Sequence, residues 1–373
     1  MDTLLTPELT TLRARARALA EDVLAPRADA ADREGRFPSE QMKALAEAGF
    51  LAMLVPADRG GNGHGPIGYA VVMSEVARVC ASTSVTMAVT NMVADAVHAW
   101  GNDAQIATHV PAIADGRYVA GAFALSEPGS GSDAASLTAT AVRDGDDYVL
   151  NGSKCWITSG DRAGLVLVMA KTDPAAKARG ISTFLVDPSS PGFSVGNHED
   201  KMGLRGSTTV TINLEEVRVP ASARLGDEGI GFKVAMRALD GGRIGIAAQA
   251  MGIAQGAFDE AVRILGRLPT TLVQAAEELD AARAMVLRAS WLKAEGEPFS
   301  QQASMAKLFA TESANRICQA AHAAVAEAGE VPTPALDRAV RDVRVTTIYE
   351  GTSEIQRLVI ARKLTRDGAH ASI

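Results

Sequence analysis

The stretch Ile348–Arg357 reads Ile-Tyr-Glu-Gly-Thr-Ser-Glu-Ile-Gln-Arg. Gly351 allows backbone conformations that other residues avoid, and Thr352 or Ser353 can cap the helix that follows. Glu350 would then stand where a loop becomes a helix, which is a position that suits a catalytic base. An ordinary capped surface turn with a solvated glutamate explains these residues equally well, because short cap motifs are common.

Four further motifs lie upstream. Phe123–Asp133 reads Phe-Ala-Leu-Ser-Glu-Pro-Gly-Ser-Gly-Ser-Asp, and Lys154–Gly160 reads Lys-Cys-Trp-Ile-Thr-Ser-Gly. Gly231–Met236 reads Gly-Phe-Lys-Val-Ala-Met, and Leu239–Ala247 reads Leu-Asp-Gly-Gly-Arg-Ile-Gly-Ile-Ala. Together with Ile348–Arg357, these motifs resemble the acyl-CoA dehydrogenase family, in the family's order and over nearly the whole chain.

Composition restricts the class of protein. The 373 residues suffice for two or three domains, and 47% hydrophobic with 22% charged residues describes an ordinary soluble globular protein. A net charge of -7 without a basic cluster argues against a nucleic-acid partner. Apolar runs are too short for a membrane span, and no segment of signal-peptide type is present, so we expect a cytoplasmic protein.

Metal and disulfide chemistry is not expected. Cys80, Cys155 and Cys318 have neither metal nor redox spacing, so we expect them to be reduced and buried. The six histidines form no ligand pair at helical spacing, and we therefore predict no metal site.

Hydrophobic periodicity divides the chain into three parts. A helical period predicts an N-terminal helical domain over residues 1–117, and it returns in a C-terminal helical bundle over 227–373. Between them, a period of two separated by turn residues predicts a central β domain over 118–226. The expected fold class is α+β, and the resemblance implies a β domain packed against two helical ones. The predicted helices cover 9–24, 39–48, 68–80, 87–100, 229–261, 275–294, 300–328 and 352–364, and the clearest predicted strands cover 164–171, 181–186 and 208–219.

The resemblance implies FAD as the cofactor. A flavin needs backbone and hydroxyl donors beside a flat apolar wall. By resemblance, Ser126 would bond the pyrimidine end of the ring, Trp156 would lie against it and Thr158 would donate near N5. Taken alone, Pro128–Asp133 is better explained as a polar turn and Trp156 as a core aromatic residue. The residues expected to contact FAD are Phe123, Leu125, Ser126, Gly131, Ser132, Trp156, Ile157, Thr158, Gly351, Thr352 and Glu354.

The resemblance also implies the reaction and its base. Glu350 would remove the α-proton of an acyl thioester while the β-hydrogen leaves as hydride, and the backbone N–H of Glu350 and the flavin ribityl hydroxyl would bind the thioester oxygen. One branch of the family carries its base on the upstream helix, where this chain has Gly241 and Gly242. The residues expected to contact substrate are Ser132, Asp240, Arg243, Tyr349, Glu350 and Gly351.

The stretch from Asp240 to Arg243 is closest to that of short-chain and short-branched-chain members, which favours a small acyl group. The same two residues, taken alone, could form an ion pair on a helix surface.

Two family features that meet the adenine half of FAD across a subunit interface are missing. The first, Arg-x-x-Phe-Gly, would follow Arg263, but the chain runs through Gly266–Pro269 straight to the next helix. Of the second, Gln-x-x-Gly-Gly, only Gly329 remains, and Glu327 occupies a position where a pyrophosphate would approach. A carboxylate there is repulsive.

Two hypotheses follow. The first is a short-chain acyl-CoA dehydrogenase, forming trans-2-enoyl-CoA, that holds FAD mainly through its own β domain or with a different subunit. The second is a flavin-poor acyl-thioester-binding subunit, or a non-redox lyase or isomerase that uses Glu350 for proton transfer. We favour the first, because Ser126, Trp156 and Thr158 would have no reason to occur together without a flavin.

The expected partners follow from the first hypothesis. They are acyl-CoA or an acyl carrier protein thioester, electron-transferring flavoprotein as oxidant, and further subunits in a homotetramer, homodimer or hetero-oligomer. No nucleic acid and no membrane is expected as a partner.

Overall fold

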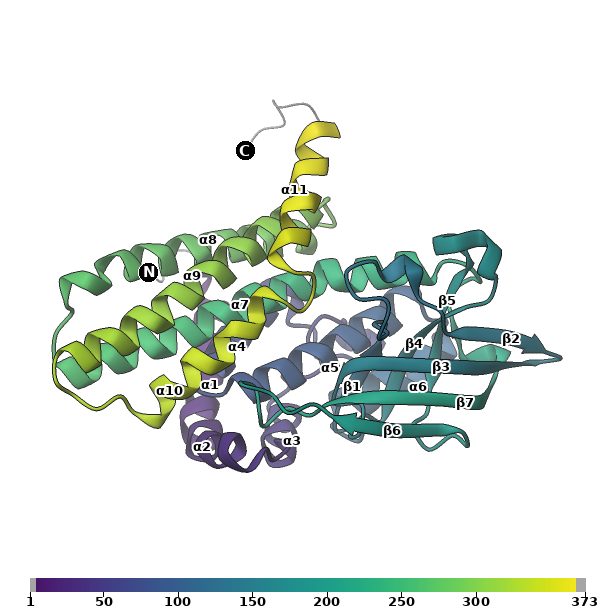
Figure 1. The fold of residues 1–373 in the computed structure, drawn as a ribbon, viewed down its shortest axis with the longest axis horizontal. Helices are drawn as coiled ribbons and strands as arrows, with labels where there is room; N and C mark the ends of the chain where they lie inside the picture. The colour runs from purple at the N-terminus through teal and green to yellow at the C-terminus, as the bar shows by residue number, and fades with distance from the viewer. Residues whose placement is uncertain (1–4, 367–373) are drawn as a thin grey trace.

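The computed structural model describes residues 5–366, so the domain ends expected at 1–4 and 367–373 lie outside the described residues. Helices, a β sheet and again helices follow one another along the chain, which confirms the predicted fold class (Figure 1). No helix among the described residues is both long and apolar enough to cross a bilayer.

The described residues of the N-terminal part form six α-helices, and the predicted helix over 9–24 forms only the first half of a longer element. Helix α1 continues through a π-helical turn, Ala20–Leu24, into α2, which ends at Gly35 in a left-handed conformation. The sequence did not predict α2 because its large apolar positions are few. The helices are α1 (Pro7–Leu19), α2 (Ala25–Glu34), α3 (Ser39–Glu47), α4 (Gly65–Val79), α5 (Ala81–Trp100) and α6 (Asp103–Ala114).

The central part is an eight-stranded sheet in the order β6-β7-β3-β2-β4-β5-β8, with β1 paired to β4. In β4, Leu165, Leu167 and Met169 join the main helical core, whereas the alternate residues pack into a second core within the sheet. Both faces of this strand are therefore buried, as its continuous apolar run predicts. The strands are β1 (Gly121–Ala124), β2 (Thr140–Asp144), β3 (Asp147–Thr158), β4 (Leu165–Lys171), β5 (Ile181–Val186), β6 (Phe193–His198), β7 (Thr209–Pro220) and β8 (Arg224–Leu225).

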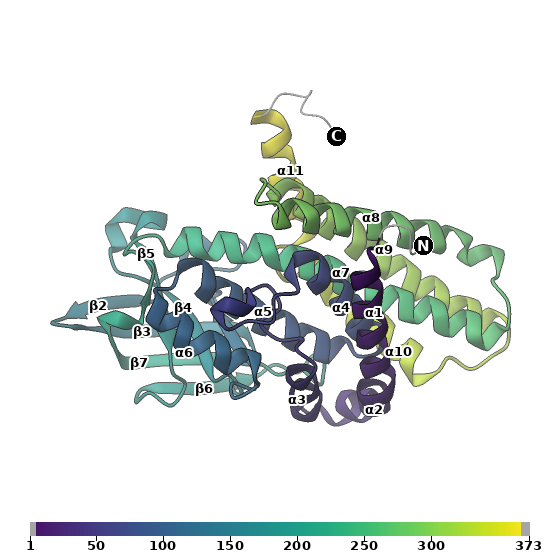
Figure 2. The same ribbon diagram turned by 180° about the vertical axis from the view of Figure 1, so that it is seen from behind.

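The C-terminal part is organised by α7, a helix of 35 residues and therefore about 50 Å long. It begins beside the sheet and runs to the opposite end of the molecule (Figure 1). Helices α9 and α10 cover one side of α7, and the reverse view shows α1, α4 and α5 on the other (Figure 2). The helices are α7 (Gly231–Leu265), α8 (Val273–Ala294), α9 (Ser300–Glu327), α10 (Pro334–Val343) and α11 (Ser353–Arg366).

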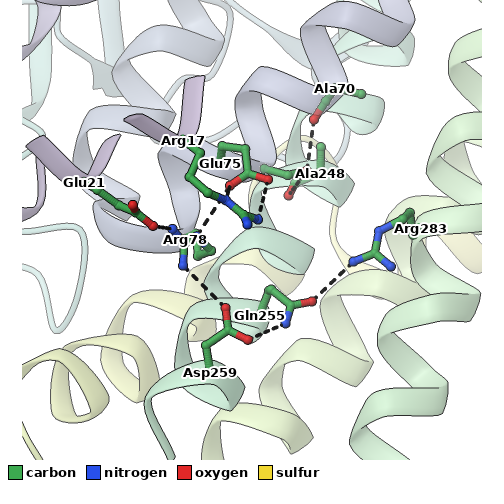
Figure 3. Close-up of polar contacts among 10 residues, drawn as sticks. Arg17, Glu21, Ala70, Glu75, Arg78, Ala248, Gln255, Asp259 and Arg283 are labelled. Carbon is green, nitrogen blue, oxygen red and sulfur yellow. Dashed lines mark hydrogen bonds and ion pairs between the residues drawn. The ribbon is translucent and has the colours of Figure 1, made fainter. Parts of the chain in front are cut away.

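An ion-pair network joins the N-terminal helices to α7 (Figure 3). Arg17 of α1 donates two hydrogen bonds of 3.0 Å to Glu75 of α4. Arg78 contacts Glu21 and, at 3.5 Å, Asp259 of α7. A cavity of about 400 Å³ lies beside this network, between α1, α4, α7 and α8. Glu350 is not among the residues that line it.

Helix α10 fixes the chain that leads to Glu350. Arg341 pairs with the buried Asp32 of α2, and the Asp342 carboxylate accepts a 2.6 Å hydrogen bond from the backbone N–H of Leu204. The same helix therefore contacts the N-terminal part and the β domain. Burial raises the pKa of Asp342 to about 6. The sequence did not predict α10, because few of its residues are large and apolar.

Candidate active site

Glu350 lies in the loop between the 3₁₀ helix Arg344–Thr347 and α11. Its backbone is left-handed, with a φ of 56°, and Gly351 follows with a φ of 92°. The left-handed region disfavours residues that carry a Cβ, so surrounding contacts must hold Glu350 there. Gln356 supplies such contacts, because its side-chain amide donates to the carbonyls of Glu350 at 3.2 Å and Gly351 at 2.8 Å. Thr352 caps α11 through a 3.4 Å bond from the N–H of Ile355.

The Glu350 carboxylate lies against α7 at Gly242. Its Oε2 is buried and has no hydrogen-bond partner among the described residues. A Cβ built on Gly242 would lie 2.5 Å from this oxygen, so only glycine leaves room for it. Burial raises the pKa of Glu350 to about 7, although Arg243 and Lys307 act in the opposite direction. The site thus holds an unbonded carboxylate that exchanges a proton near neutral pH.

Asp240 and Arg243 meet beside this carboxylate. The Arg243 guanidinium donates to Asp240 at 2.5 Å and to the Ser304 hydroxyl at 3.2 Å, and Ser300 also bonds Asp240 at 3.0 Å. Arg243 is only 5% exposed, which rules out the solvated surface pair that spacing alone allowed. Its Nε is buried and has no hydrogen-bond partner within residues 5–366.

Two tyrosines approach the same face of α7. The Tyr349 hydroxyl donates to the side-chain oxygen of Gln249, whose own amide bonds Ala81 at 3.1 Å and Ser84 at 2.8 Å. Tyr69 of α4 is buried, and its hydroxyl lies against Gly245, one helical turn beyond Gly241. Burial, reinforced by Glu350, raises the pKa of Tyr69. Sequence patterns missed Tyr69, because its spacing is that of any core residue.

Trp156 lies on the β domain in an unusual setting. It is 57% exposed and left-handed, with a φ of 58°, at a register shift between Lys154 and Ile157 of β3. A Cβ on Gly131 would come 3.7 Å from the indole, so the glycine-rich loop lies beside the ring. A strained, exposed indole gains nothing from the core, which suggests a ligand as its partner.

A buried ion pair joins the two segments expected to hold the flavin. Lys154 donates to Glu127 at 2.7 Å and to the Leu125 carbonyl at 3.2 Å. Glu127 also accepts bonds from the backbone N–H groups of Thr138 and Ala139. Burial alone would raise the pKa of Glu127, but Lys154 and these donors lower it overall. The sequence motifs did not reveal this pair, because the two residues are 27 positions apart.

The other residues expected near FAD differ in exposure. Leu125 and Ile157 are buried, Ser126 and Thr158 are half-buried, and Ser132 is exposed. Glu354 is an exposed residue of the first turn of α11, and its side chain is 76% exposed. The Cys155 N–H bonds the Ser126 carbonyl at 3.0 Å, so the two segments lie side by side.

Phe123 links this wall to α7. It packs against Val89, Met92 and Ala238, and Ala238 stands one helical turn before Gly242. The exposed indole and the hydroxyls of Ser126 and Thr158 fit the apolar wall and polar donors that a flavin ring requires. The buried hydroxyl of Ser159, which has no hydrogen-bond partner among the described residues, adds a further donor.

The two segments that depart from the family pattern, the α7–α8 connection and the end of α9, lie far from the flavin wall formed by Trp156, Ser126 and Thr158. The α7–α8 connection spans only residues 266–272, and Glu327 ends α9. Both stand at the end of the bundle opposite the sheet (Figure 1). Because α7 is about 50 Å long, they cannot reach the flavin wall of their own chain.

Comparison with known proteins gives consistent matches. Models of the N-terminal, middle and C-terminal domains of acyl-CoA dehydrogenases match residues 6–117, 122–217 and 229–365. The mitochondrial short-chain specific acyl-CoA dehydrogenase of Bos taurus is 43% identical, over 95% of this chain and 89% of its own. The acryloyl-CoA reductase (NADH) of Anaerotignum propionicum is 39% identical, over 98% and 96%.

Solved structures agree. Butyryl-CoA dehydrogenase from Megasphaera elsdenii superposes with a TM-score of 0.93 at 34% identity, over 98% of this chain and 100% of that one. A chain from a structure of the electron transferring flavoprotein of Acidaminococcus fermentans gives 0.94 at 37%, over 98% and 100%. Glutaryl-CoA dehydrogenase from Mycobacterium smegmatis, in complex with FADH2, gives 0.90 at 27%, over 98% and 96%.

The resemblance inferred from the motifs is thereby confirmed, since the three domain models together match most of the chain and relatives above 30% identity cover nearly all of it: the chain belongs to the acyl-CoA dehydrogenase family.

Proposed function

We propose that the protein is an FAD-dependent dehydrogenase that converts a short-chain acyl-CoA into the trans-2-enoyl-CoA. The observation that carries the proposal is the Glu350 carboxylate, which is unbonded at Oε2, lies against Gly242 and has a pKa of about 7. A base with this pKa is well matched to proton abstraction near neutral pH.

Glu350 takes the α-proton onto its carboxylate. In the described part of the chain, no acceptor bonds the backbone N–H of Glu350, so this donor is available to the thioester oxygen. A hydrogen bond there stabilises the negative charge that develops on the oxygen as the proton leaves. Arg243 stands beside Glu350 and favours its ionised form. FAD, when bound, supplies the acceptor for the β-hydrogen.

The flavin would be held by the β-domain wall. Ser126 and Thr158 offer hydroxyls, and Trp156 and Phe123 offer apolar surface. In this proposal, Gly351, Thr352 and Glu354 would approach the flavin from the start of α11. The FADH2 complex of a structural neighbour supports FAD as the cofactor. A neighbour from a structure of an electron transferring flavoprotein supports such a protein as the oxidant.

The acyl group is short in this proposal. Tyr69 lies against Gly245 on the face of α7 that Glu350 occupies at Gly242, so it limits the room beside the base. A short-chain specific relative and the butyryl-CoA dehydrogenase structure support the same conclusion.

A second function is favoured by one observation. The shortened α7–α8 connection and the exposed Glu327 suggest weak FAD retention. A flavin-poor acyl-thioester-binding subunit, or a lyase or isomerase using Glu350 for proton transfer alone, would tolerate that loss.

Anaerobic mixing of the FAD-loaded protein with butyryl-CoA separates the two. The dehydrogenase should bleach the visible flavin absorbance, and Glu350→Gln should slow this step by about 10³-fold or more while still binding the ligand. Glu47→Gln, an exposed glutamate on α3, is the matched control and should behave as wild type. No bleaching by any short acyl-CoA in the loaded wild-type protein would contradict the proposal.

A further inference from the structure

Lys307 of α9 is fully buried beneath the active-site loop. Its Nζ donates a 2.8 Å hydrogen bond to the carbonyl of Gly351. Among residues 5–366, no carboxylate lies within ion-pair distance of this amine, although burying an ammonium group without such a partner is costly. Lys307 therefore bonds a backbone carbonyl next to the base and not a carboxylate. An arrangement this costly indicates a functional role for the amine.

The amine holds an unusual turn. Glu350 and Gly351 are consecutive left-handed residues. The Gly351 carbonyl accepts hydrogen bonds from Lys307 and from the side-chain amide of Gln356, and the Glu350 carbonyl accepts one from the same amide. With both carbonyls held on that side, the backbone N–H of Glu350 has no acceptor among the described residues. The hydrogen bond from Lys307 thus helps to orient the carboxylate and the backbone N–H of Glu350, the two groups that would meet the thioester.

The charges around the amine come from three helices. These are Arg243 of α7, Glu312 of α9 and Glu354 of α11, and Glu350 of the active-site loop acts on the amine as well. Burial lowers the pKa of Lys307 to about 7, Glu350 opposes that effect, and Lys307 in turn lowers the pKa of Glu350. Tyr69 and Tyr349 also face Glu350, and burial raises the pKa of both.

We propose that Lys307 is a positioning residue, whose amine fixes the Glu350–Gly351 turn and whose positive charge favours the ionised form of Glu350. The inference rests on the proposed function, since it concerns the base of that reaction. Nothing in the sequence distinguished Lys307 from the other residues of α9.

Two substitutions separate charge from shape. Lys307→Met keeps the length of the side chain but removes the charge and the donor, whereas Lys307→Arg keeps the charge. In Lys307→Met, the acidic limb of the pH profile of kcat/KM should move up by about one unit, which is about a tenfold loss below pH 7. Much of that loss should be recovered at high pH. Lys307→Arg should keep the limb near its wild-type position.

A merely structural role predicts a different pattern. Activity in Lys307→Met would then fall by the same factor at every pH, and that result would overturn the proposal. Lys201→Met is the matched control, because Lys201 also donates to a backbone carbonyl, that of Ser207 at 2.8 Å, on the β domain. Its pH profile should equal that of the wild type.

A second measurement does not depend on turnover. Carbon-13 labelling of glutamate carboxyl groups, with Glu350→Gln to assign the signal, gives the titration of Glu350 by NMR in flavin-free protein. The midpoint should rise by about one unit in Lys307→Met and stay unchanged in Lys201→Met. An unchanged midpoint in Lys307→Met overturns the inference even if the dehydrogenase activity is established. A shifted midpoint in a protein that reduces no flavin supports the inference while the proposed function fails.

Discussion

The carboxylate of Glu350 and the backbone of Gly242 are in direct contact, since a Cβ at position 242 would lie 2.5 Å from Oε2 and 2.9 Å from Cδ. Two segments that are 108 positions apart thus form one feature, with the base supplied by a loop and its space by a helix. The glycine costs helix stability, about 1 kcal/mol relative to alanine, and the base occupies the space that the missing side chain leaves.

Gly242→Ala tests this contact. Because the new Cβ meets the base itself, Glu350 must move, and a displacement of about 1 Å costs on the order of 10² in rate. Flavin reduction by butyryl-CoA should fall accordingly, in rapid-mixing experiments. Gly241→Ala is the control, since its Cβ would meet only the flexible end of Lys293 at 2.9 Å, and its rate should change little. Equal effects of the two substitutions would contradict the steric interpretation.

The raised pKa of Glu350 predicts a pH-dependent stability. The group titrates at about 7 in the folded protein instead of 4.5, so the folded state binds the proton more tightly. Stability therefore falls as pH rises between these values, by roughly 3 kcal/mol. Glu350→Gln should unfold a few degrees higher than wild type at pH 8, and at nearly the same temperature at pH 4.5. A difference of equal size at both pH values would contradict the assignment.

The Glu127–Lys154 pair predicts a link between stability and flavin binding. Lys154→Met leaves a buried carboxylate without its partner, which costs about 3 to 5 kcal/mol. The variant should lose thermal stability and FAD affinity together, and Glu127→Gln in the same chain should recover part of both. Arg218→Met, in an exposed pair of the same sheet, is the control, because such pairs contribute about 1 kcal/mol or less.

The position of Tyr69 beside the base leads to a prediction about the length of the acyl group. The wild type should prefer acyl groups of roughly four to five carbons, because a closed site rejects additional methylenes sterically. Tyr69→Ala should raise kcat/KM for octanoyl-CoA relative to butyryl-CoA, while Tyr69→Phe keeps the ring and should keep the preference. A wild-type preference for palmitoyl-CoA would refute the short-chain assignment.

The parts of the fold that the sequence predicted are those with strong local patterns. The predicted strands over 164–171 and 181–186 differ from the observed ones by at most one residue, because buried β-branched runs between turns are distinctive. Helices α2, α6 and α10 were not singled out. Alanine and charged residues fill most positions of α2 and α10, which leaves few large apolar residues, and Pro111 lies inside α6.

The candidate site, like the fold, could be predicted from the sequence only in part. The motifs pointed to Glu350, but not to the contact with Gly242, to Tyr69, to Lys307 or to the pair of Glu127 with Lys154. Each of these depends on side chains that are brought together over long distances in the sequence, and a local pattern holds no record of such contacts.

The last prediction concerns FAD retention. The resemblance implies that a partner subunit meets the adenine half of FAD through an arginine, an aromatic residue and a glycine-backed pyrophosphate site. In this chain the corresponding places are the short connection over 266–272 and the end of α9, where Glu327 is exposed. Losing two or three charge-assisted hydrogen bonds, at about 1.5 to 3 kcal/mol each, weakens binding by several orders of magnitude.

A homo-oligomer should therefore purify partly or wholly without FAD, and coexpression with a related subunit that carries both intact segments should restore one FAD per site. Within the homo-oligomer, Glu327→Gln should tighten FAD by about fivefold or less, the usual scale for one exposed charge, and Glu330→Gln should not. Calorimetric titration of the flavin-free protein with FAD decides the matter. Nanomolar affinity in the homo-oligomer would show that other residues replace the missing segments, because Glu327 and the short connection could not then limit binding.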